Sequence, residues 1–304
     1  MVLARALVGI GVIDINLLSL ALEGDRRSLA RMITSIESGE RTNLPKHPNN
    51  WSLGVTGPPG VGKSTLIGSM AEYWVENGET VAILAIDPSS PVSGGSLLAD
   101  RLRMGAIGTN NSVFIRSMSS RNNSGGSLPF LDDIVSLLSN CGWTRVIIET
   151  VGSGQSEIRV VAYADRILLV DGPDRGDIIQ AEKAGILELS DVIVINKADL
   201  PNAKNTAKMV REGLELGESP SPHIHLASAL DGSGISELVE TLESLVIDKS
   251  RQKIRNREQL LANWDSLLLN HPEIEGNLEN ISDGSKTITE AIRDMASSIN
   301  FGGN

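Results

Sequence analysis

Eight residues near position 60 have the types and spacing of a loop that holds a polyphosphate. The sequence Gly57-Pro-Pro-Gly-Val-Gly-Lys-Ser64 fits the pattern G-x-x-x-x-G-K-[ST], between an apolar run at 53–56 and a helical pattern that starts at Thr65. In such a loop, backbone N–H groups surround phosphate oxygens at a helix N-terminus, Lys63 reaches the β- and γ-phosphates, and the Ser64 hydroxyl ligates Mg²⁺. The sequence therefore predicts a site for a nucleoside triphosphate with Mg²⁺. Its predicted residues are Gly57, Pro58, Pro59, Gly60, Val61, Gly62, Lys63, Ser64 and Thr65.

Three carboxylates are candidates to hold that metal ion or its waters. Asp87 directly follows the apolar run 81–86, and Asp100 lies at the far side of a loop rich in Pro, Gly and Ser. Glu149 stands three residues before Gly152, which is the D-x-x-G arrangement of nucleotide switches with Glu in place of Asp. We expect the catalysis to depend on Lys63, Asp87, Asp100, Glu149 and Gly152. A solvated turn for Asp87 and a helix-terminal charge for Asp100 are the alternatives.

A second segment predicts which base is bound. In Asn196-Lys-Ala-Asp199, the Asp199 carboxylate can accept hydrogen bonds from N1–H and the 2-amino group of guanine, which adenine does not present. The stem of Lys197 can cover the ring face, and Asn196 is expected to brace the neighbouring loops. Ser228-Ala229-Leu230 follows the last predicted strand, and its backbone is expected to meet guanine O6. The sequence therefore favours GTP over ATP.

Short apolar runs alternate with helical segments from position 51 onward, which is typical of βαβ units and a largely parallel sheet. The predicted strands cover residues 53–56, 81–86, 113–115, 146–149, 167–170, 192–196 and 223–227. This pattern predicts an α/β fold: a P-loop NTPase with a mostly parallel doubly wound sheet. In such sheets ligands bind at the carboxyl ends of the strands, where the candidate residues lie.

Helical extensions are expected on both sides of that domain. We predict an N-terminal helical extension at 1–48, a P-loop GTPase domain at 49–248, and a C-terminal helical arm at 249–304. The helical pattern at 26–36 is expected to lie on the core. In the arm, residues 251–269 form an amphipathic pattern, which predicts packing against a neighbour or a second subunit. Its apolar residues are Leu260, Leu261, Trp264, Leu267 and Leu268.

Composition excludes several other classes. The net charge of -11 argues against nucleic acid or an anionic membrane as a partner, since those surfaces are bound by clustered Lys and Arg. One cysteine, Cys141, suits a reducing compartment, so a cytoplasmic protein is expected. The apolar run at 2–22 is interrupted by Arg5, Asp14 and Asn16, which disfavours a signal peptide or a membrane span. His223 and His225 share a predicted strand face but lack further ligands for a metal.

With these residues considered together, the chain resembles the MeaB/ArgK family of G proteins over about residues 17 to 264. The family contains GTPase chaperones of the adenosylcobalamin-dependent methylmalonyl-CoA mutase. Besides the phosphate loop and Asn196–Asp199, the resemblance is carried by Glu23-Gly-Asp-Arg-Arg27, Asp87-Pro-Ser-Ser90 with Gly94-Gly-Ser96, Glu149-Thr-Val-Gly152 through Gly154-Gln-Ser-Glu157, and Gly176-Asp177 with Gln180 and Lys183.

The resemblance implies a role for most of these positions. Asp87, Asp100 and Glu149 would complete the metal shell around Ser64. Gln180 and Lys183 share a helical face, which alone indicates only a solvated surface, but the resemblance implies a switch that signals to the mutase. It also implies that hydrolysis of GTP to GDP and phosphate gates adenosylcobalamin loading and protection of the mutase or a related acyl-CoA mutase. A homodimer formed through the C-terminal helices is implied as well.

Three other functions remain possible from the residues. A kinase or ATPase of basic amino-acid transport would use ATP, against which Asp199 argues. A nickel-type metallochaperone GTPase would need a Cys/His cluster, and the chain has one cysteine. A scaffold would bind GTP without turning it over.

Overall fold

The computed structural model describes residues 14–42, 44–87, 110–119, 128, 130–150, 156–173, 184–214, 221–246, 249–269 and 271–298. The strands are β1 (Trp51–Thr56), β2 (Val81–Asp87), β3 (Val113–Ser119), β4 (Arg145–Thr150), β5 (Arg166–Asp171), β6 (Val192–Ile195) and β7 (His223–Leu226). The helices are α1 (Ile15–Leu22), α2 (Arg26–Glu37), α3 (Lys63–Glu76), α5 (Leu131–Asn140), α6 (Ser156–Val161), α7 (Ala184–Leu189), α8 (Ala203–Leu214), α9 (Ile235–Ser244), α10 (Lys249–Leu269), α11 (Ile274–Ser282) and α12 (Ile288–Ser298).

The strands form one parallel sheet in the order β3-β2-β4-β1-β5-β6-β7. Each predicted apolar run falls on one strand, so the predicted parallel sheet is confirmed. The largest difference is in β3, which continues to Ser119 although Arg116 and Ser117 end the apolar run. Arg116 is accommodated because its guanidinium forms an ion pair with Glu37 of α2 at 2.6 Å. A counter-ion on α2, outside the sheet, thus allows the edge strand β3 to contain a charged residue.

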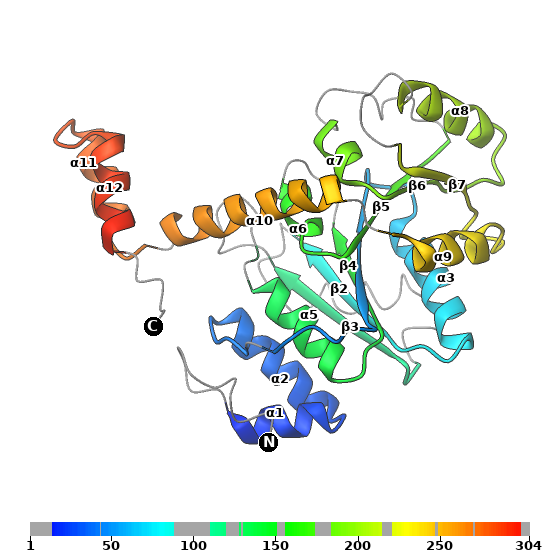
Figure 1. The fold of residues 1–304 in the computed structure, drawn as a ribbon, viewed down its shortest axis with the longest axis horizontal. Helices are drawn as coiled ribbons and strands as arrows, with labels where there is room; N and C mark the ends of the chain where they lie inside the picture. The colour runs from blue at the N-terminus through cyan, green and yellow to red at the C-terminus, as the bar shows by residue number, and fades with distance from the viewer. Residues whose placement is uncertain are drawn as a thin grey trace.

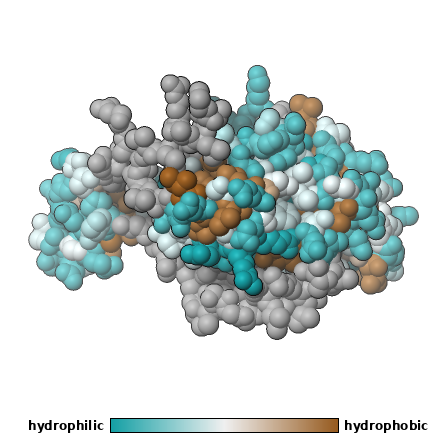
Figure 2. All heavy atoms as spheres, turned by 90° about the horizontal axis from the view of Figure 1, so that it is seen from below, coloured by the Kyte–Doolittle hydropathy of each residue, from teal (hydrophilic) through white to brown (hydrophobic). Residues whose placement is uncertain are grey.

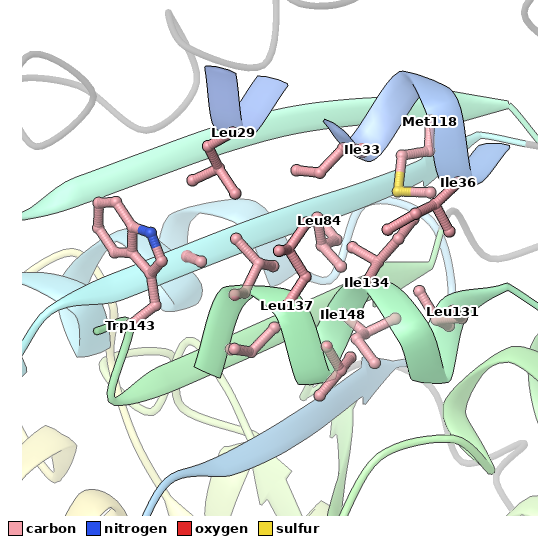
Figure 3. Packing of buried hydrophobic residues seen from close by; sticks show 14 of the residues in the cluster. Leu29, Ile33, Ile36, Leu84, Met118, Leu131, Ile134, Leu137, Trp143 and Ile148 are labelled. Carbon is pink, nitrogen blue, oxygen red and sulfur yellow. The ribbon is translucent and has the colours of Figure 1, made fainter. Parts of the chain in front are cut away.

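Helices cover both faces of the sheet, because strand side chains alternate between the two faces. On β2, Ala82, Leu84 and Ile86 pack under α2 and α5, whereas Val81 and Ile83 pack under α3 and α9. Figure 3 shows the first of these layers, where side chains of α2 and α5 meet those of the strands. The labelled residues are Leu29, Ile33, Ile36, Leu84, Met118, Leu131, Ile134, Leu137, Trp143 and Ile148. Residues of α7 and α8 form a further cluster with β5 and β6. The doubly wound arrangement is therefore confirmed.

The N-terminal helices α1 and α2 lie against the β3 side of the sheet (Figure 1). The Asp25 carboxylate accepts a hydrogen bond from Ser28 N and caps α2, while Arg26 donates to the carbonyls of Asn111 and Val113, each at 2.7 Å. The Arg26 guanidinium also lies over the ring of Trp143, 5.2 Å from its centre. The expected helix at 26–36 is thus docked on the core.

The C-terminal helix α10 runs from the sheet out to a hairpin of α11 and α12 (Figure 1). Figure 2 shows the molecule from below and includes a patch of apolar residues near the middle of that face. Ile15 and Leu20 of α1 are among the large apolar side chains that are exposed. Among the described helices, none is long and apolar enough to cross a bilayer.

Candidate functional site

The loop between β1 and α3 has the backbone that its glycines predict. Gly57, Gly60 and Gly62 have φ values of 144°, 80° and 91°, which only glycine adopts easily. A Cβ atom at Gly57 would lie 1.9 Å from the carbonyl oxygen of Val170, and one at Gly62 would lie 2.6 Å from Nδ2 of Asn196. Two of the glycines are therefore required by close neighbours as well as by backbone conformation.

Lys63 is the first residue of α3, and its side chain is held inside the loop. Its Nζ donates to the carbonyl oxygens of Gly57 at 2.7 Å and Pro58 at 3.0 Å, and the residue is buried. A buried ammonium next to a helix N-terminus creates a strongly positive centre. This arrangement is suited to a polyphosphate.

Two of the predicted metal ligands are in direct contact. The Ser64 hydroxyl, at the start of α3, donates to Oε1 of Glu149 at 2.6 Å. Glu149 is buried on β4, next to Val55 of β1 and Ala85 of β2 in the register of the sheet. Hydroxyl and carboxylate oxygens are the donors that Mg²⁺ prefers, so this pair fits the expected ion.

The other expected metal and switch residues are described only in part. Asp87 ends β2, a neighbour of β4, so its backbone lies on the same edge of the sheet as Glu149. Asp100, Gly152, Gln180 and Lys183 lie outside the described residues. Their roles stay predictions. Across the described parts of the chain, three or more His, Cys, Asp or Glu side chains do not come together as a metal site.

Asn196 connects the three loops of the predicted nucleotide site. Its Nδ2 donates to the carbonyl of Val61 at 2.9 Å, and its Oδ1 accepts from the backbone N–H of Ala229 at 3.2 Å. Its own backbone N–H donates to the carbonyl of Asp171 at the end of β5. The expected bracing role of Asn196 is therefore seen directly in its contacts.

Lys197 and Asp199 continue this network on the solvent side. Lys197 has a φ of 58°, uncommon for a residue other than glycine, and its Nζ donates to the carbonyl of Gly60 at 2.9 Å. The exposed Asp199 accepts a hydrogen bond from the buried Ser228 hydroxyl at 2.8 Å. That bond holds one carboxylate oxygen, so the orientation of the carboxylate is set before any base arrives.

The loop after β7 is fixed by contacts that the sequence did not predict. Ser69 of α3 donates from its hydroxyl to the carbonyl of Ala229 at 3.1 Å, whereas Leu230 is exposed. Asp231 follows, and hydrogen bonds from Ser233 lower the pKa of its carboxyl. The expected contact of this loop with guanine O6 stays a prediction. The sequence does not indicate this role of Ser69, because the role depends on a residue 160 positions away.

Asp171 is a further residue at this edge to which we assigned no role. It ends β5, beside β1, and is buried with 1% of its surface exposed. The strand-end rule that selected Asp87 and Glu149 applies to it equally. Its carbonyl supports Asn196, so it contributes to the site through its backbone.

Together, the strand, glycine loop and helix with Lys63 and Ser64, joined to Asn196–Asp199, define a P-loop GTPase. Comparison with known proteins identifies the family. The sequence model of the protein family described as "Methylmalonyl Co-A mutase-associated GTPase MeaB" matches residues 29–271. The chain belongs to this MeaB family.

Two relatives agree with that assignment, and a solved structure shares the fold. "Putative GTPase PYRAB02490" of Pyrococcus abyssi is 42% identical over 201 residues, 64% of this chain and 62% of the relative's length. "GTPase ArgK" of Escherichia coli is 33% identical over 274 residues, 82% of this chain and 83% of the relative. The crystal structure of an "LAO/AO transport system kinase" has a TM-score of 0.62 at 24% identity, covering 94% of this chain and 99% of that one. That structural similarity establishes the fold.

Proposed function

We propose that GTP hydrolysis by this chain controls the loading and protection of adenosylcobalamin in an acyl-CoA mutase, methylmalonyl-CoA mutase or a relative. The observation that carries this proposal is the match to the MeaB family model, whose description names the mutase. The match includes the phosphate loop, Glu149 and Asn196–Asp199, which are the parts needed for nucleotide turnover. The partner and the cofactor cycle are therefore proposed from the family, and the chemistry from the site.

In the proposed mechanism the protein mainly positions GTP and neutralises charge. Lys63 and the loop N–H groups hold the β- and γ-phosphates, and Asp199, oriented by Ser228, accepts from the guanine edge. Ser64 and Glu149 would hold Mg²⁺, Glu149 through a water molecule, with Asp87 and Asp100 completing the shell. When bound, Mg²⁺ neutralises charge on the phosphates. Water then attacks the γ-phosphorus in line with the leaving GDP.

We also propose that the protein is a cytoplasmic homodimer without nucleic-acid or membrane partners. The C-terminal helices expose apolar side chains that a second copy would cover. The largest exposed fractions are 70% for Leu260, 64% for Ile288 and 47% for Leu278. The net charge of -11 supports the absence of nucleic-acid and membrane partners, and the single cysteine supports a cytoplasmic location.

Hydrolysis assays with and without the host's cobalamin-dependent acyl-CoA mutase test the proposal. We expect GTP but not ATP to be hydrolysed slowly, and the mutase to raise the rate by about tenfold or more by ordering the switch segments. Lys183→Ala should keep GTP binding and lose the stimulation, whereas Lys63→Ala should lose phosphate binding itself. Unchanged slow turnover in the presence of the mutase would refute the proposed client. A preference for ATP would refute the assigned role of Asp199 and favour the transport-kinase alternative.

A further inference from the structure

One face of α10 is bonded to the helices that follow the nucleotide strands. Arg255, Gln259 and Asn263 are spaced four residues apart, so they project from one side of the helix. Gln259 Nε2 donates to the carbonyl of Ala162 at 2.6 Å, and Asn263 Nδ2 donates to the Tyr163 hydroxyl at 3.0 Å. Ala162 and Tyr163 directly follow α6. We call Arg255, Gln259 and Asn263 the α10 ladder.

Arg255 is the most deeply buried member of the ladder. Its side chain is 0% exposed and forms an ion pair with Asp191, which is 3% exposed. The same guanidinium donates to the carbonyl of Asp165, before β5, and to the carbonyl of Leu189, the last residue of α7, at 3.4 Å. At Leu189 the cation satisfies a carbonyl that a helix end leaves unpaired. Arg255 thus joins α10 to the end of α7 and to the turn between α6 and β5.

An apolar cluster fills the space beside these bonds. Val161 of α6, Ile167 of β5 and Leu189 of α7 are buried together, with Ile158 of α6 and Ile254 of α10 packed against them. Close packing of this kind transmits displacement, because the interior leaves little room for independent movement. The ladder and this cluster make α6, α7 and α10 one mechanical unit.

Helices α6 and α7 of this unit each directly follow a segment that is predicted to respond to the nucleotide or to signal to the partner. Helix α6 begins directly after residues 151–155, which include Gly152, and α7 begins directly after residues 174–183, which include Gln180 and Lys183. The first segment is expected to sense the γ-phosphate, and the second to signal to the partner. A displacement of either segment therefore reaches a helix that α10 holds.

We propose that the α10 ladder couples the nucleotide state of the site to the position of the C-terminal arm, α11 and α12. This inference rests on the proposed function, since it requires GTP and GDP to occupy the site. Helix α10 has 21 residues and is about 30 Å long. Its ladder lies within the first fifteen of these, so a small tilt at α6 and α7 moves the hairpin by a larger distance.

Coupling of this kind acts in both directions. Suppose that GTP favours one arm position and thereby raises the affinity of the arm for a protein that binds this position. That protein must then raise the affinity for GTP by the same factor. A partner bound to the arm would thereby alter nucleotide affinity without touching the nucleotide site. The arm, and not only the switch segments, becomes a control point.

Distance measurement between spin labels on the full chain tests the proposal. Labels at Glu240→Cys on α9 and Glu279→Cys on α11, in a Cys141→Ala background, report the distance from the domain to the arm. Excess unlabelled protein removes distances between copies. We expect the mean distance to differ by about 2 Å or more between GDP and a non-hydrolysable GTP analogue, because known interface helix shifts are about 1–2 Å and the length of α10 enlarges the shift at the arm. Gln259→Ala with Asn263→Ala should remove that difference.

A matched control lies on the same helix. Gln252 and Asn256 have the same residue types and spacing and bond to each other at 2.9 Å, but both are exposed. Gln252→Ala with Asn256→Ala should therefore keep the full nucleotide-dependent shift. Calorimetric binding of both nucleotides is measured on every sample, so a protein that binds no guanine nucleotide refutes the proposed function itself. Normal binding with an unchanged distance, or an equal shift in the ladder variant, refutes only the coupling.

Discussion

At the scale of single residues, the site is built from direct bonds between side chains far apart in the chain. Ser64 and Glu149 are 85 positions apart, yet their oxygen atoms lie 2.6 Å from each other. Ser228 and Asp199 are 29 positions apart and 2.8 Å from each other. In both pairs a hydroxyl orients a carboxylate. Such preorganisation reduces the reordering that binding would otherwise require.

The charge of Glu149 can be tested apart from its geometry. Glu149→Gln keeps an oxygen that accepts from Ser64, so the fold should be retained while the negative charge near the metal is lost. We expect the Mg²⁺ concentration needed for half-maximal GTP hydrolysis to rise by about 10- to 100-fold. The measurement is a Mg²⁺ titration of phosphate release.

Glu79 offers the control for this substitution. It bonds Arg145 at the opposite edge of the sheet, so Glu79→Gln should leave the Mg²⁺ dependence unchanged. Equal Mg²⁺ dependence of Glu149→Gln and the unchanged protein would show that Glu149 has no metal role.

At the scale of elements, the packing of α6 on β1 depends on a glycine within a strand. Gly54 faces α6, and a Cβ atom there would lie 2.9 Å from Cβ of Val161 and 3.2 Å from Cβ of Ala164. Glycine is unfavourable in strands, but here it allows α6 to approach the sheet closely. Helix α6 is therefore held between β1 on one side and α10 on the other.

Substitution of Gly54 should be destabilising despite the better strand propensity of the new residue. Gly54→Ala forces α6 outward, and we expect a loss of about 1–3 kcal/mol in the free energy of unfolding, measured by urea denaturation. Gly276 of α11 is the contrasting position, because an added Cβ meets nothing within 4 Å. Gly276→Ala should be neutral or stabilising by up to about 1 kcal/mol. A neutral Gly54→Ala would show that the α6–β1 contact is loosely packed.

At the scale of the whole molecule, the start of the C-terminal arm is tied into the GTPase domain. The expected division at residue 248 stays a prediction, but α10 beyond it contributes the fully buried Arg255 and the buried Ala262. The same helix also exposes Leu260, Leu267 and Leu269. One helix thus contributes buried side chains to the domain and also presents exposed apolar side chains to the outside.

The ion pair of Arg255 should therefore matter for the stability of the domain. Arg255→Met leaves Asp191 buried without this cation, and we expect a loss of about 3–5 kcal/mol in the free energy of unfolding, measured by urea denaturation. Adding Asp191→Asn removes the stranded charge and keeps an acceptor for the backbone N–H of Ile167, so it should recover part of the loss. Release of the arm with an unchanged transition of the domain would contradict this prediction.

Much of the fold and site could be predicted because its signals are local. The loop Gly57–Ser64, the tetrapeptide Asn196–Asp199 and the apolar runs of the strands are each contiguous, and their chemistry depends on neighbours in the chain. Parallel strands bring their carboxyl ends to the same end of the sheet, so the proximity of Glu149 to Ser64 could be predicted from the sequence. The extension of β3 through Arg116 could not be predicted, because its counter-ion comes from α2.

By itself, the sequence determined the nucleotide loop, the preference for guanine and the alternation of strands and helices. The tertiary structure alone decided that Ser69 supports Ala229, that Gly54 admits α6, and that Arg255 enters the core. The physical reason is that a charged residue on a polar helical pattern is normally solvated. Burial of Arg255 becomes favourable only because the sheet brings Asp191, the carbonyl of Asp165 before β5 and the carbonyl of Leu189 at the end of α7 to its guanidinium.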